Sequence, residues 1–177
     1  MKVFAFIGKK GAGKDTAADT LVDQGFTKFA LTDKVKQIVR DVYGVTVEEQ
    51  TDRVLKETQL KRWPYLSPRQ LDRLVAEDMF RGHDPDTWVH YGERAIRNLL
   101  LDGKRKIAVS DLRRPNEAAM LRDRFDATVI RIVNPRLADN DKHASEAEQE
   151  QVVADYTIYN ERGVRDFQQA VLAIAGY

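Results

Sequence analysis

The sequence predicts an α/β fold with a parallel sheet. Short apolar runs alternate with longer amphipathic segments, and this alternation is typical of strands joined by helical crossovers. Three of the runs are apolar or β-branched nearly throughout, as strands buried on both faces should be. A glycine-rich turn stands between the first run and the first amphipathic segment. At 177 residues the chain is long enough for one ordinary domain with its own core.

Five segments are the strand candidates, and they are 3–7, 27–30, 106–110, 128–133 and 156–159. Helical signals fill the intervals. Apolar residues at helical spacing begin with Ala17 and Ala18 before Gly25, and Val164, Phe167, Val171 and Ile174 predict a closing helix. Two capping boxes, Thr46 with Glu49 and Ser67 with Gln70, predict helix starts between them.

Two intervals are unusual. The segment 46–103 is long for one crossover, so we expect a helical excursion over one end of the sheet. The polar segment 134–142 lacks periodicity and is a candidate mobile loop.

Composition excludes several classes of protein. The net charge of +1 argues against a protein that binds a nucleic acid polymer. The absence of cysteine excludes disulfides and thiolate metal sites, and the three histidines (His83, His90 and His143) lack metal-ligand spacing. The first apolar run has only five residues, too few for a secretory leader or a membrane span. We therefore expect a cytoplasmic protein with no membrane partner. A homodimer is possible, although the sequence does not reveal the oligomeric state.

The motif "GKKGAGKDT" (residues 8–16, here called the phosphate loop) resembles G-x-x-x-x-G-K-[ST] between a strand and a helix. Its glycines Gly8, Gly11 and Gly13 allow backbone amides, that of Ala12 included, to face an anion, and the following helix directs its positive end to the same place. Lys14 is placed to reach the β- and γ-phosphates of a nucleotide. The alternative is an ordinary glycine-rich turn with a solvated lysine.

Asp15 occupies the position where this motif has a hydroxyl that binds Mg²⁺. A carboxylate can also bind Mg²⁺, directly or through water, and Thr16 can supply the hydroxyl one residue later. We expect Asp15, Thr16 or both on the metal side of the site. Alternatively, Asp15 only favours the helix N-terminus.

The segment "SDLRRPNEA" (residues 110–118) places Asp111 at the carboxyl end of a predicted strand, the edge where open α/β sheets bind ligands. Asp111 can hold Mg²⁺ through water or accept a proton from an attacking phosphate or hydroxyl. Arg113 and Glu117 lie where the next helix begins. The alternatives are that Asp111 caps the turn and that Glu117 pairs with an arginine.

The segment "SPRQLDRLVAEDMFR" (residues 67–81) places Arg69, Arg73 and Phe80 on one helix face, opposite Leu71 and Val75. Paired guanidinium groups suit a terminal phosphate. The alternative is a solvated face.

Trp88 is either a core residue or an aromatic that stacks on a base.

The chain resembles the bacteriophage deoxynucleoside monophosphate kinases. The ordered segments that carry this resemblance are "GKKGAGKDT", "SPRQLDRLVAEDMFR", "DTW", "SDLRRPNEA", "KHASE" and "ADYTIYNERG", which span nearly the whole chain. The resemblance implies a P-loop kinase fold, three-layer αβα with a five-stranded parallel sheet, in a single domain over 1–177. Within it, 46–103 would be a helical insertion that binds the nucleoside monophosphate, and 134–144 would be a short lid.

The resemblance also implies an ATP-dependent phosphotransferase that converts a deoxynucleoside monophosphate into the diphosphate, with Mg²⁺. It assigns ATP and metal to Lys14, Asp15 and Thr16. The residues that would bind the acceptor are Arg69, Arg73, Trp88, Asp111, Arg113 and Glu117. The residues that would take part in catalysis are Lys14, Asp15, Asp111 and Arg113. The metal would lie at Asp15, Thr16 and Asp111. Asn160 in "YNERG" would border the adenine. Arg136 and Lys142 are the cations that the lid offers, without a definite match.

Two other functions stay open at this point. One is another small-molecule P-loop kinase, such as a phosphomevalonate or dephospho-coenzyme A kinase. The other is a nucleotide-binding switch without an acceptor, although the guanine-reading motif N-K-x-D is absent from the sequence.

Overall fold

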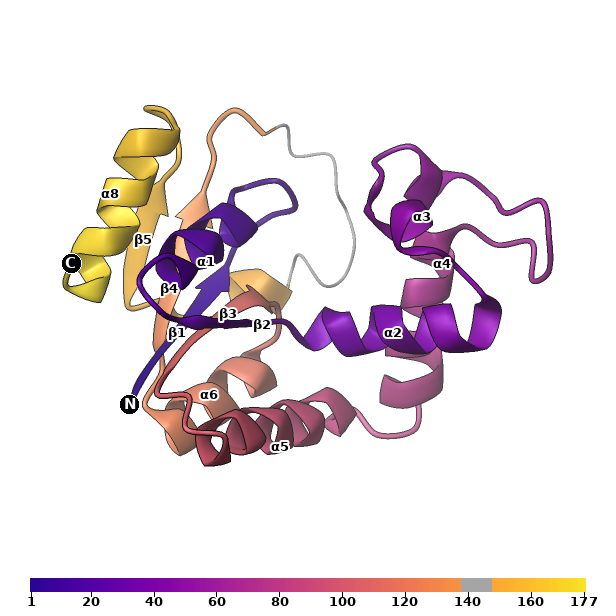
Figure 1. The fold of residues 1–177 in the computed structure, drawn as a ribbon, viewed down its shortest axis with the longest axis horizontal. Coiled ribbons are helices and arrows are strands. Elements are labelled where there is room, and N and C mark those ends of the chain that lie inside the picture. Colours follow the sequence, from indigo (N-terminus) through magenta and orange to yellow (C-terminus); the bar gives the residue numbers. More distant parts are fainter. Residues whose placement is uncertain (138–147) are drawn as a thin grey trace. The chain divides into compact units, whose positions relative to one another are not determined.

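Five parallel strands form one sheet in the computed structural model, which describes residues 1–137 and 148–177 (Figure 1). The strands are β1 (Lys2–Ile7), β2 (Thr27–Phe29), β3 (Lys106–Leu112), β4 (Thr128–Val133) and β5 (Tyr156–Tyr159), in the order β2-β3-β1-β4-β5. In the register, Val3 pairs with Ile107 and Phe4 with Thr128. All five predicted strands are confirmed. The third strand continues to Leu112, so Asp111 is the second-to-last residue of β3.

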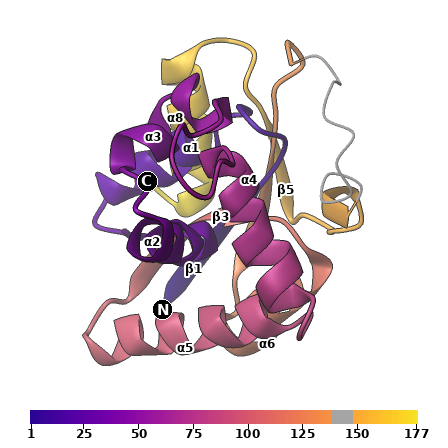
Figure 2. The same cartoon turned by 90° about the vertical axis from the view of Figure 1, so that its right-hand side faces the viewer.

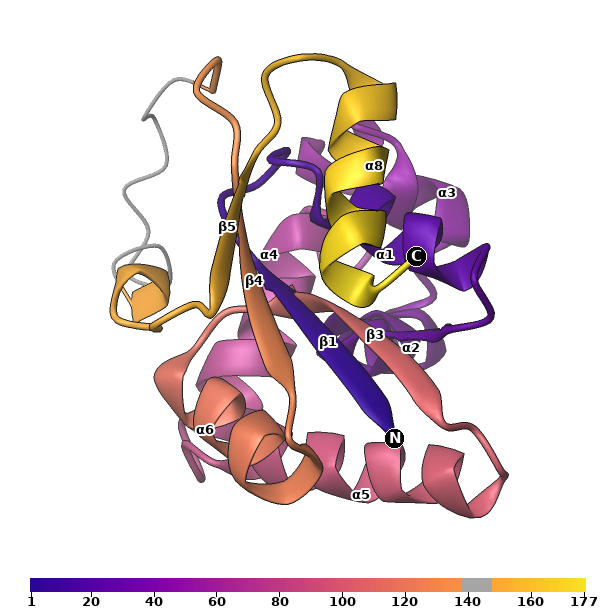
Figure 3. The ribbon, with the colours of Figure 1, turned by 90° about the vertical axis from the view of Figure 1, so that its left-hand side faces the viewer.

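Helices cover both faces of the sheet. On one face lie α1 (Lys14–Val22) and α8 (Val164–Ala175), which contact each other (Figures 1 and 3). On the other lie α6 (Pro115–Phe125) and the second half of α5 (Thr87–Leu101). The apolar side chains of β1 and β4 are buried between these layers, for example Phe6 and Ile130 at 0% exposure. The three-layer αβα arrangement is therefore confirmed.

The chain divides into two compact units. The first unit contains Met1–Ala30 and Tyr91–Tyr177, and the second unit contains Leu31–His90. The second unit consists of α2 (Leu31–Tyr43), α3 (Val47–Thr51), the 3₁₀ turn η1 (Leu55–Glu57), α4 (Pro68–Arg73), the π-helix η2 (Leu74–Arg81) and the start of α5. It begins and ends earlier than the expected excursion over 46–103. Its earlier start follows from α2, which packs against α4 and η2.

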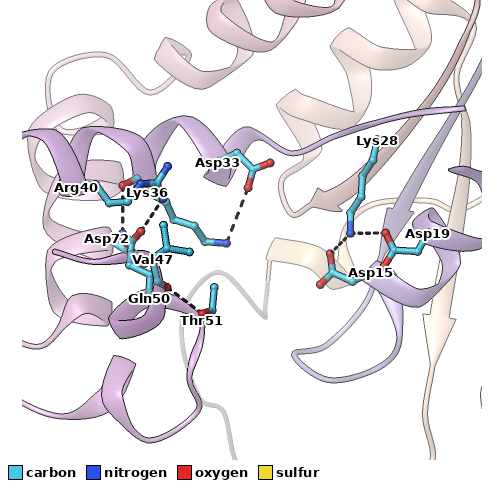
Figure 4. Close-up of polar contacts among 10 residues, drawn as sticks. All are labelled: Asp15, Asp19, Lys28, Asp33, Lys36, Arg40, Val47, Gln50, Thr51 and Asp72. Atoms are coloured by element: carbon cyan, nitrogen blue, oxygen red, sulfur yellow. Dashed lines mark hydrogen bonds and ion pairs between the residues drawn. The ribbon is translucent and has the colours of Figure 1, made fainter.

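Gln50 holds three helices of the second unit together (Figure 4). Its side chain is 5% exposed, and its amide nitrogen donates to the Lys36 carbonyl at 3.2 Å and to Asp72 Oδ1 at 3.1 Å. Its amide oxygen accepts from Arg40 Nη1 at 2.8 Å. A buried amide with all these partners is a cross-link that fixes α3 on α2 and α4.

The helix that begins with α4 (Figure 2) changes from α-helical to π-helical winding at Leu74. Its start is confirmed, because Ser67 and Gln70 form the predicted capping box. From Leu74 on, the bonds run from residue i+5 to residue i, as from the Gly82 N–H to the Glu77 carbonyl at 2.7 Å. A wider turn shifts every later side chain around the axis. The prediction that aligned Phe80 with the two arginines used the α-helical period and is therefore wrong.

Two further observations concern regions named by the sequence. No helix in the described ranges 1–137 and 148–177 is long and apolar enough to span a membrane. Of the expected lid over 134–144, the structure describes only 134–137, so the rest of that expectation, with Lys142, lies outside the described residues.

Candidate active site

The phosphate loop connects β1 to α1, as predicted, and close neighbours require glycine at two of its positions, Gly8 and Gly13. At Gly8 (φ 152°) a Cβ atom would lie 2.3 Å from the Ile132 carbonyl oxygen. At Gly13 (φ 113°) it would lie 2.8 Å from the Asn160 amide nitrogen. Any other residue at these positions would have to displace backbone or a packed side chain. The loop therefore has the backbone shape of an anion-binding turn at a helix N-terminus.

Lys14 lies at the first position of α1 and folds back over the loop. Its ammonium group donates to the carbonyl oxygens of Gly8 and Lys9, the latter at 3.0 Å. These carbonyls flank the turn in which an anion would lie. The ammonium group thus lies at the phosphate loop, which is compatible with the predicted role.

Asp15 forms an ion pair with a lysine that sequence reasoning missed (Figure 4). Lys28 of β2 binds Asp15 Oδ1 at 3.0 Å and Asp19 Oδ1 at 2.9 Å, so it joins two carboxylates one turn apart on α1. Burial alone would lower the pKa of Lys28, but the hydrogen bonds to Asp19 and Asp15 more than offset this, and the pKa is raised. The Asp15 side chain is 80% exposed, so the pair is worth less than about 1 kcal/mol. A side chain so weakly held can exchange partners.

Thr16 follows on α1 and is half-buried. Its carbonyl accepts from the Thr20 hydroxyl at 2.8 Å, which fixes the backbone of this turn.

The carboxyl end of β3 brings Asp111 to the same edge of the sheet as the phosphate loop, because β1 and β3 are neighbouring parallel strands. Asp111 is half-buried. On either side of it in the sequence, Ser110 Oγ and Arg113 Nε are buried and have no hydrogen-bond partner in the part of the chain that the structure describes. Buried polar atoms of this kind usually have a partner, so a polar ligand or water is expected here. Sequence reasoning singled out Arg113 but not Ser110.

Glu117 occupies a structural position. It is 2% exposed, and its Oε2 accepts from the backbone N–H groups of Arg113 and Arg114 at 3.0 and 3.1 Å. The carboxylate thus fixes the turn from β3 into α6 and stabilises the helix N-terminus. These contacts favour a role in shaping the site over direct contact with a substrate.

In the second unit, Arg69 and Arg73 lie one turn apart on α4, and Leu71 and Val75 are buried on the other side, as predicted. Arg69 Nε binds Glu57 Oε1 at 2.7 Å. Arg73 is exposed and forms no ion pair with any residue of the described ranges. The geometry leaves one paired and one available guanidinium group on this helix.

Trp88 is 3% exposed and belongs to the core of the second unit. Its indole nitrogen donates to the Ala76 carbonyl at 2.9 Å, and its ring packs against Phe80 with centroids 5.3 Å apart. The buried indole ring and its N–H group therefore have partners within the second unit. The core interpretation left open by the sequence is favoured over stacking on a base.

Asn160 follows β5 and donates from its side-chain amide to the Ala12 carbonyl of the phosphate loop at 2.9 Å. It is thus adjacent to the loop, in the same unit. Arg136, at the start of the expected lid, donates to the Glu161 carbonyl at 2.8 Å.

The donor set at this edge of the first unit suits Mg²⁺. The hydroxyl of Thr16 and the carboxylates of Asp15 and Asp111 are hard oxygen ligands, and Mg²⁺ typically uses one or two carboxylates together with substrate phosphates and water. In the described ranges no three His, Cys, Asp or Glu side chains form a metal-binding cluster.

Comparison with known proteins places the chain among kinases. No known protein-family profile matches it. It is 26% identical over 185 residues to a protein of Acanthamoeba polyphaga mimivirus that is provisionally named a deoxynucleotide monophosphate kinase, covering 98% of this chain and 95% of that one. The match is therefore to a giant virus, and a bacteriophage origin is not shown.

Among solved structures, the chain is similar to dephospho-CoA kinase from Campylobacter jejuni, with a TM-score of 0.55, 18% identity and coverage of 99% and 96% of the two chains. It is also similar to a sugar kinase from Janibacter, with a TM-score of 0.53, 15% identity and coverage of 98% and 93%. At these identities the structural likeness establishes the fold alone. Together with the full-length similarity to the mimivirus protein, it identifies the chain as a phosphotransferase with the P-loop kinase fold, whose acceptor these comparisons leave open.

Proposed function

We propose that the chain is a deoxynucleoside monophosphate kinase, which transfers the γ-phosphoryl group of ATP to a deoxynucleoside 5′-monophosphate and yields ADP and the diphosphate. The observation that carries this proposal is the similarity over 98% of the chain to the mimivirus protein of that provisional name. The phosphate loop and the polar end of β3 support it, since both chemical requirements of a kinase, an anion-binding turn and an acidic strand end, occur at one sheet edge.

The donor half of the reaction belongs to the phosphate loop. Its backbone amides and the N-terminus of α1 bind the β- and γ-phosphates of ATP, and Lys14 leaves the carbonyls of Gly8 and Lys9 to neutralise the charge that moves during transfer. Thr16, Asp15 and Asp111 would hold Mg²⁺, which supplies further charge neutralisation when it is bound.

On the acceptor side, the reaction needs positive charge to bind the phosphate more than it needs a general base to remove a proton. The second pKa of a phosphate monoester is about 6, so at neutral pH most of the acceptor is already a dianion whose oxygen can attack. We therefore assign Asp111 to the metal side and to positioning rather than to proton removal. In the second unit, Arg69 and Arg73 on α4 would bind the acceptor phosphate by charge-assisted hydrogen bonds.

An assay of ADP release across acceptors tests this function. The panel contains the common nucleoside and deoxynucleoside monophosphates, dephospho-coenzyme A, phosphomevalonate and a sample without acceptor. Turnover that depends on a deoxynucleoside monophosphate is expected. Turnover with dephospho-coenzyme A or phosphomevalonate alone would contradict the proposal, and turnover without acceptor would favour a nucleotide switch.

A matched pair of variants tests the role of Arg73 on α4. Arg73→Ala is expected to raise the acceptor KM or lower kcat by about 10- to 100-fold, the range for one charge-assisted interaction, with little change in ATP binding. Arg53→Ala, which removes another exposed arginine of the second unit, is the control and should leave both constants unchanged. Equal behaviour of the two variants would return Arg73 to a solvated helix face.

A further inference from the structure

Asn160 is held in place by the sheet itself. Its backbone N–H donates to the Val133 carbonyl at 2.7 Å, which extends the ladder of β4 and β5 by one residue. One residue further on, the carbonyl of Glu161 accepts from Arg136 at 2.8 Å, which holds the chain after Asn160 as well. The Asn160 side chain therefore starts from a rigid support.

From this support the side chain reaches across to the phosphate loop. Its Nδ2 donates to the Ala12 carbonyl at 2.9 Å, a contact between residues 148 positions apart in the chain. Ala12 is 1% exposed, so this carbonyl lies in the packed inner side of the loop.

The orientation of one peptide links Asn160 to the anion site. The peptide between Ala12 and Gly13 is not among the cis bonds, and in a planar trans peptide the carbonyl and the following N–H point in opposite directions. Because Asn160 binds the Ala12 carbonyl, it sets the direction of the Gly13 N–H, which points away from Asn160. In a loop of this kind, that N–H belongs to the amides that surround the phosphates.

The absence of a side chain at Gly13 completes the fit. A Cβ atom there would lie 2.8 Å from Asn160 Nδ2 and 3.5 Å from the ring of Phe167. Asn160 thus packs into space that only glycine leaves open. At the other end of the loop Gly8 rests on the Ile132 carbonyl. The loop is fixed from β4 at its beginning and from Asn160 at its end.

We propose that Asn160 is a positioning residue for phosphate binding, which orients the Ala12–Gly13 peptide of the phosphate loop, rather than a residue that contacts adenine. The inference rests on the proposed use of this loop for nucleotide phosphates and does not depend on which acceptor is phosphorylated. It predicts that loss of the Asn160 amide weakens binding of phosphates and spares binding of the base.

The test compares ligands that contain only one of the two parts. Affinities of wild type and Asn160→Ala are measured by isothermal titration for tripolyphosphate and ATP, and by ligand-detected NMR for adenosine. The affinity for tripolyphosphate and for ATP should fall by about tenfold, the effect of one lost hydrogen bond, while that for adenosine stays within twofold of wild type. Loss of adenosine affinity with unchanged tripolyphosphate affinity would overturn the proposal, and so would unchanged affinity for all three ligands.

Two variants separate positioning from general damage. Glu161→Gln alters an exposed side chain of the same loop and should bind every ligand as wild type does. Asn160→Ser keeps a donor on a shorter side chain, and it should recover part of the tripolyphosphate affinity if the loss in Asn160→Ala comes from the missing donor. If Asn160→Ala does not fold, Asn160→Ser is compared with wild type instead: its affinity for tripolyphosphate should fall by more than its affinity for adenosine, and the opposite order or no change in either would overturn the proposal. Failure of the acceptor assay would leave these binding results unchanged, so the two proposals fail separately.

Discussion

Replacing Glu117 tests how the turn after β3 is built. Its buried carboxylate oxygen Oε2 accepts two backbone N–H groups, those of Arg113 and Arg114. In Glu117→Ala both donors lose their acceptor, and an unsatisfied buried donor costs about 1–3 kcal/mol. Because water has partial access to these two N–H groups, each should cost an amount near the lower end of this range. The expected loss in the free energy of unfolding is therefore about 2–4 kcal/mol.

Glu117→Gln is the matched control, because its amide oxygen keeps an acceptor in the same place. The glutamine variant should lose only about 1 kcal/mol, the difference between a charged and a neutral acceptor. Both variants are measured by urea unfolding at pH 7, followed by circular dichroism. The denaturant dependence should stay unchanged, since the same surface is exposed on unfolding.

A result within about 0.5 kcal/mol of wild type for Glu117→Ala would refute this reasoning, because surface substitutions without structural consequence fall in that range. If the same variant lost turnover while keeping its stability, the carboxylate would have to act on the substrate, as the sequence resemblance implied.

Two further variants test the second unit. Gln50→Leu removes the hydrogen-bond donor to Asp72, a half-buried carboxyl group whose pKa is already raised by burial. The free energy of unfolding of the second unit should fall by about 1–3 kcal/mol, measured by urea unfolding with tryptophan fluorescence. Wild-type stability would show that the cross-link is dispensable. The hydrogen bond from Arg62, with that from the Thr46 backbone, lowers the pKa of Glu49 from 4.5 to about 2, so this carboxylate stabilises the fold above about pH 4.5 and loses its contribution as pH falls to 2. Glu49→Gln should therefore be less stable than wild type at pH 6, by up to about 1 kcal/mol, and equal to it near pH 2; a constant difference across this range would contradict the assignment.

The sheet and the phosphate loop were predictable because local rules and tertiary structure agree there. The runs around Phe6 and Ile130 are apolar or β-branched nearly throughout, a pattern typical of strands buried on both faces. Gly8 and Gly13 stood in a motif whose spacing implies close backbone contacts, and the structure shows what those contacts are.

In the second unit, local sequence rules were not sufficient to predict the structure. An α-helical period was applied through Phe80, but the winding widens after Arg73, and no local sequence signal distinguishes the two windings. Trp88 had two interpretations because an aromatic at helical spacing fits both, and its burial with its bond to Ala76 favours the core.

Residues that act across the sheet were the hardest to assign. Asn160 reaches the phosphate loop from 148 positions away in the chain, and Lys28 reaches α1 from the next strand along the chain. The partners of both residues depend on how strands and helices pack. Strand order is a property of the tertiary structure, and local sequence motifs do not reveal it. A polar residue just after a predicted strand was the signal available for Asn160.

The ion pair of Lys28 explains how a phosphate loop can carry an acid where an anion must bind. Asp15 and Asp19 place two negative charges on the first two turns of α1, whose positive end would otherwise attract phosphate unopposed. Lys28 lies between the two carboxylates and compensates one of these charges without using the loop's own lysine. Under the proposed function, this leaves the Asp15 charge to Lys28 and the phosphates to Lys14. Because the pair is exposed and weak, Asp15 can also leave Lys28 for a cation that arrives with the phosphates, so charge compensation and a metal-side role for Asp15 are compatible.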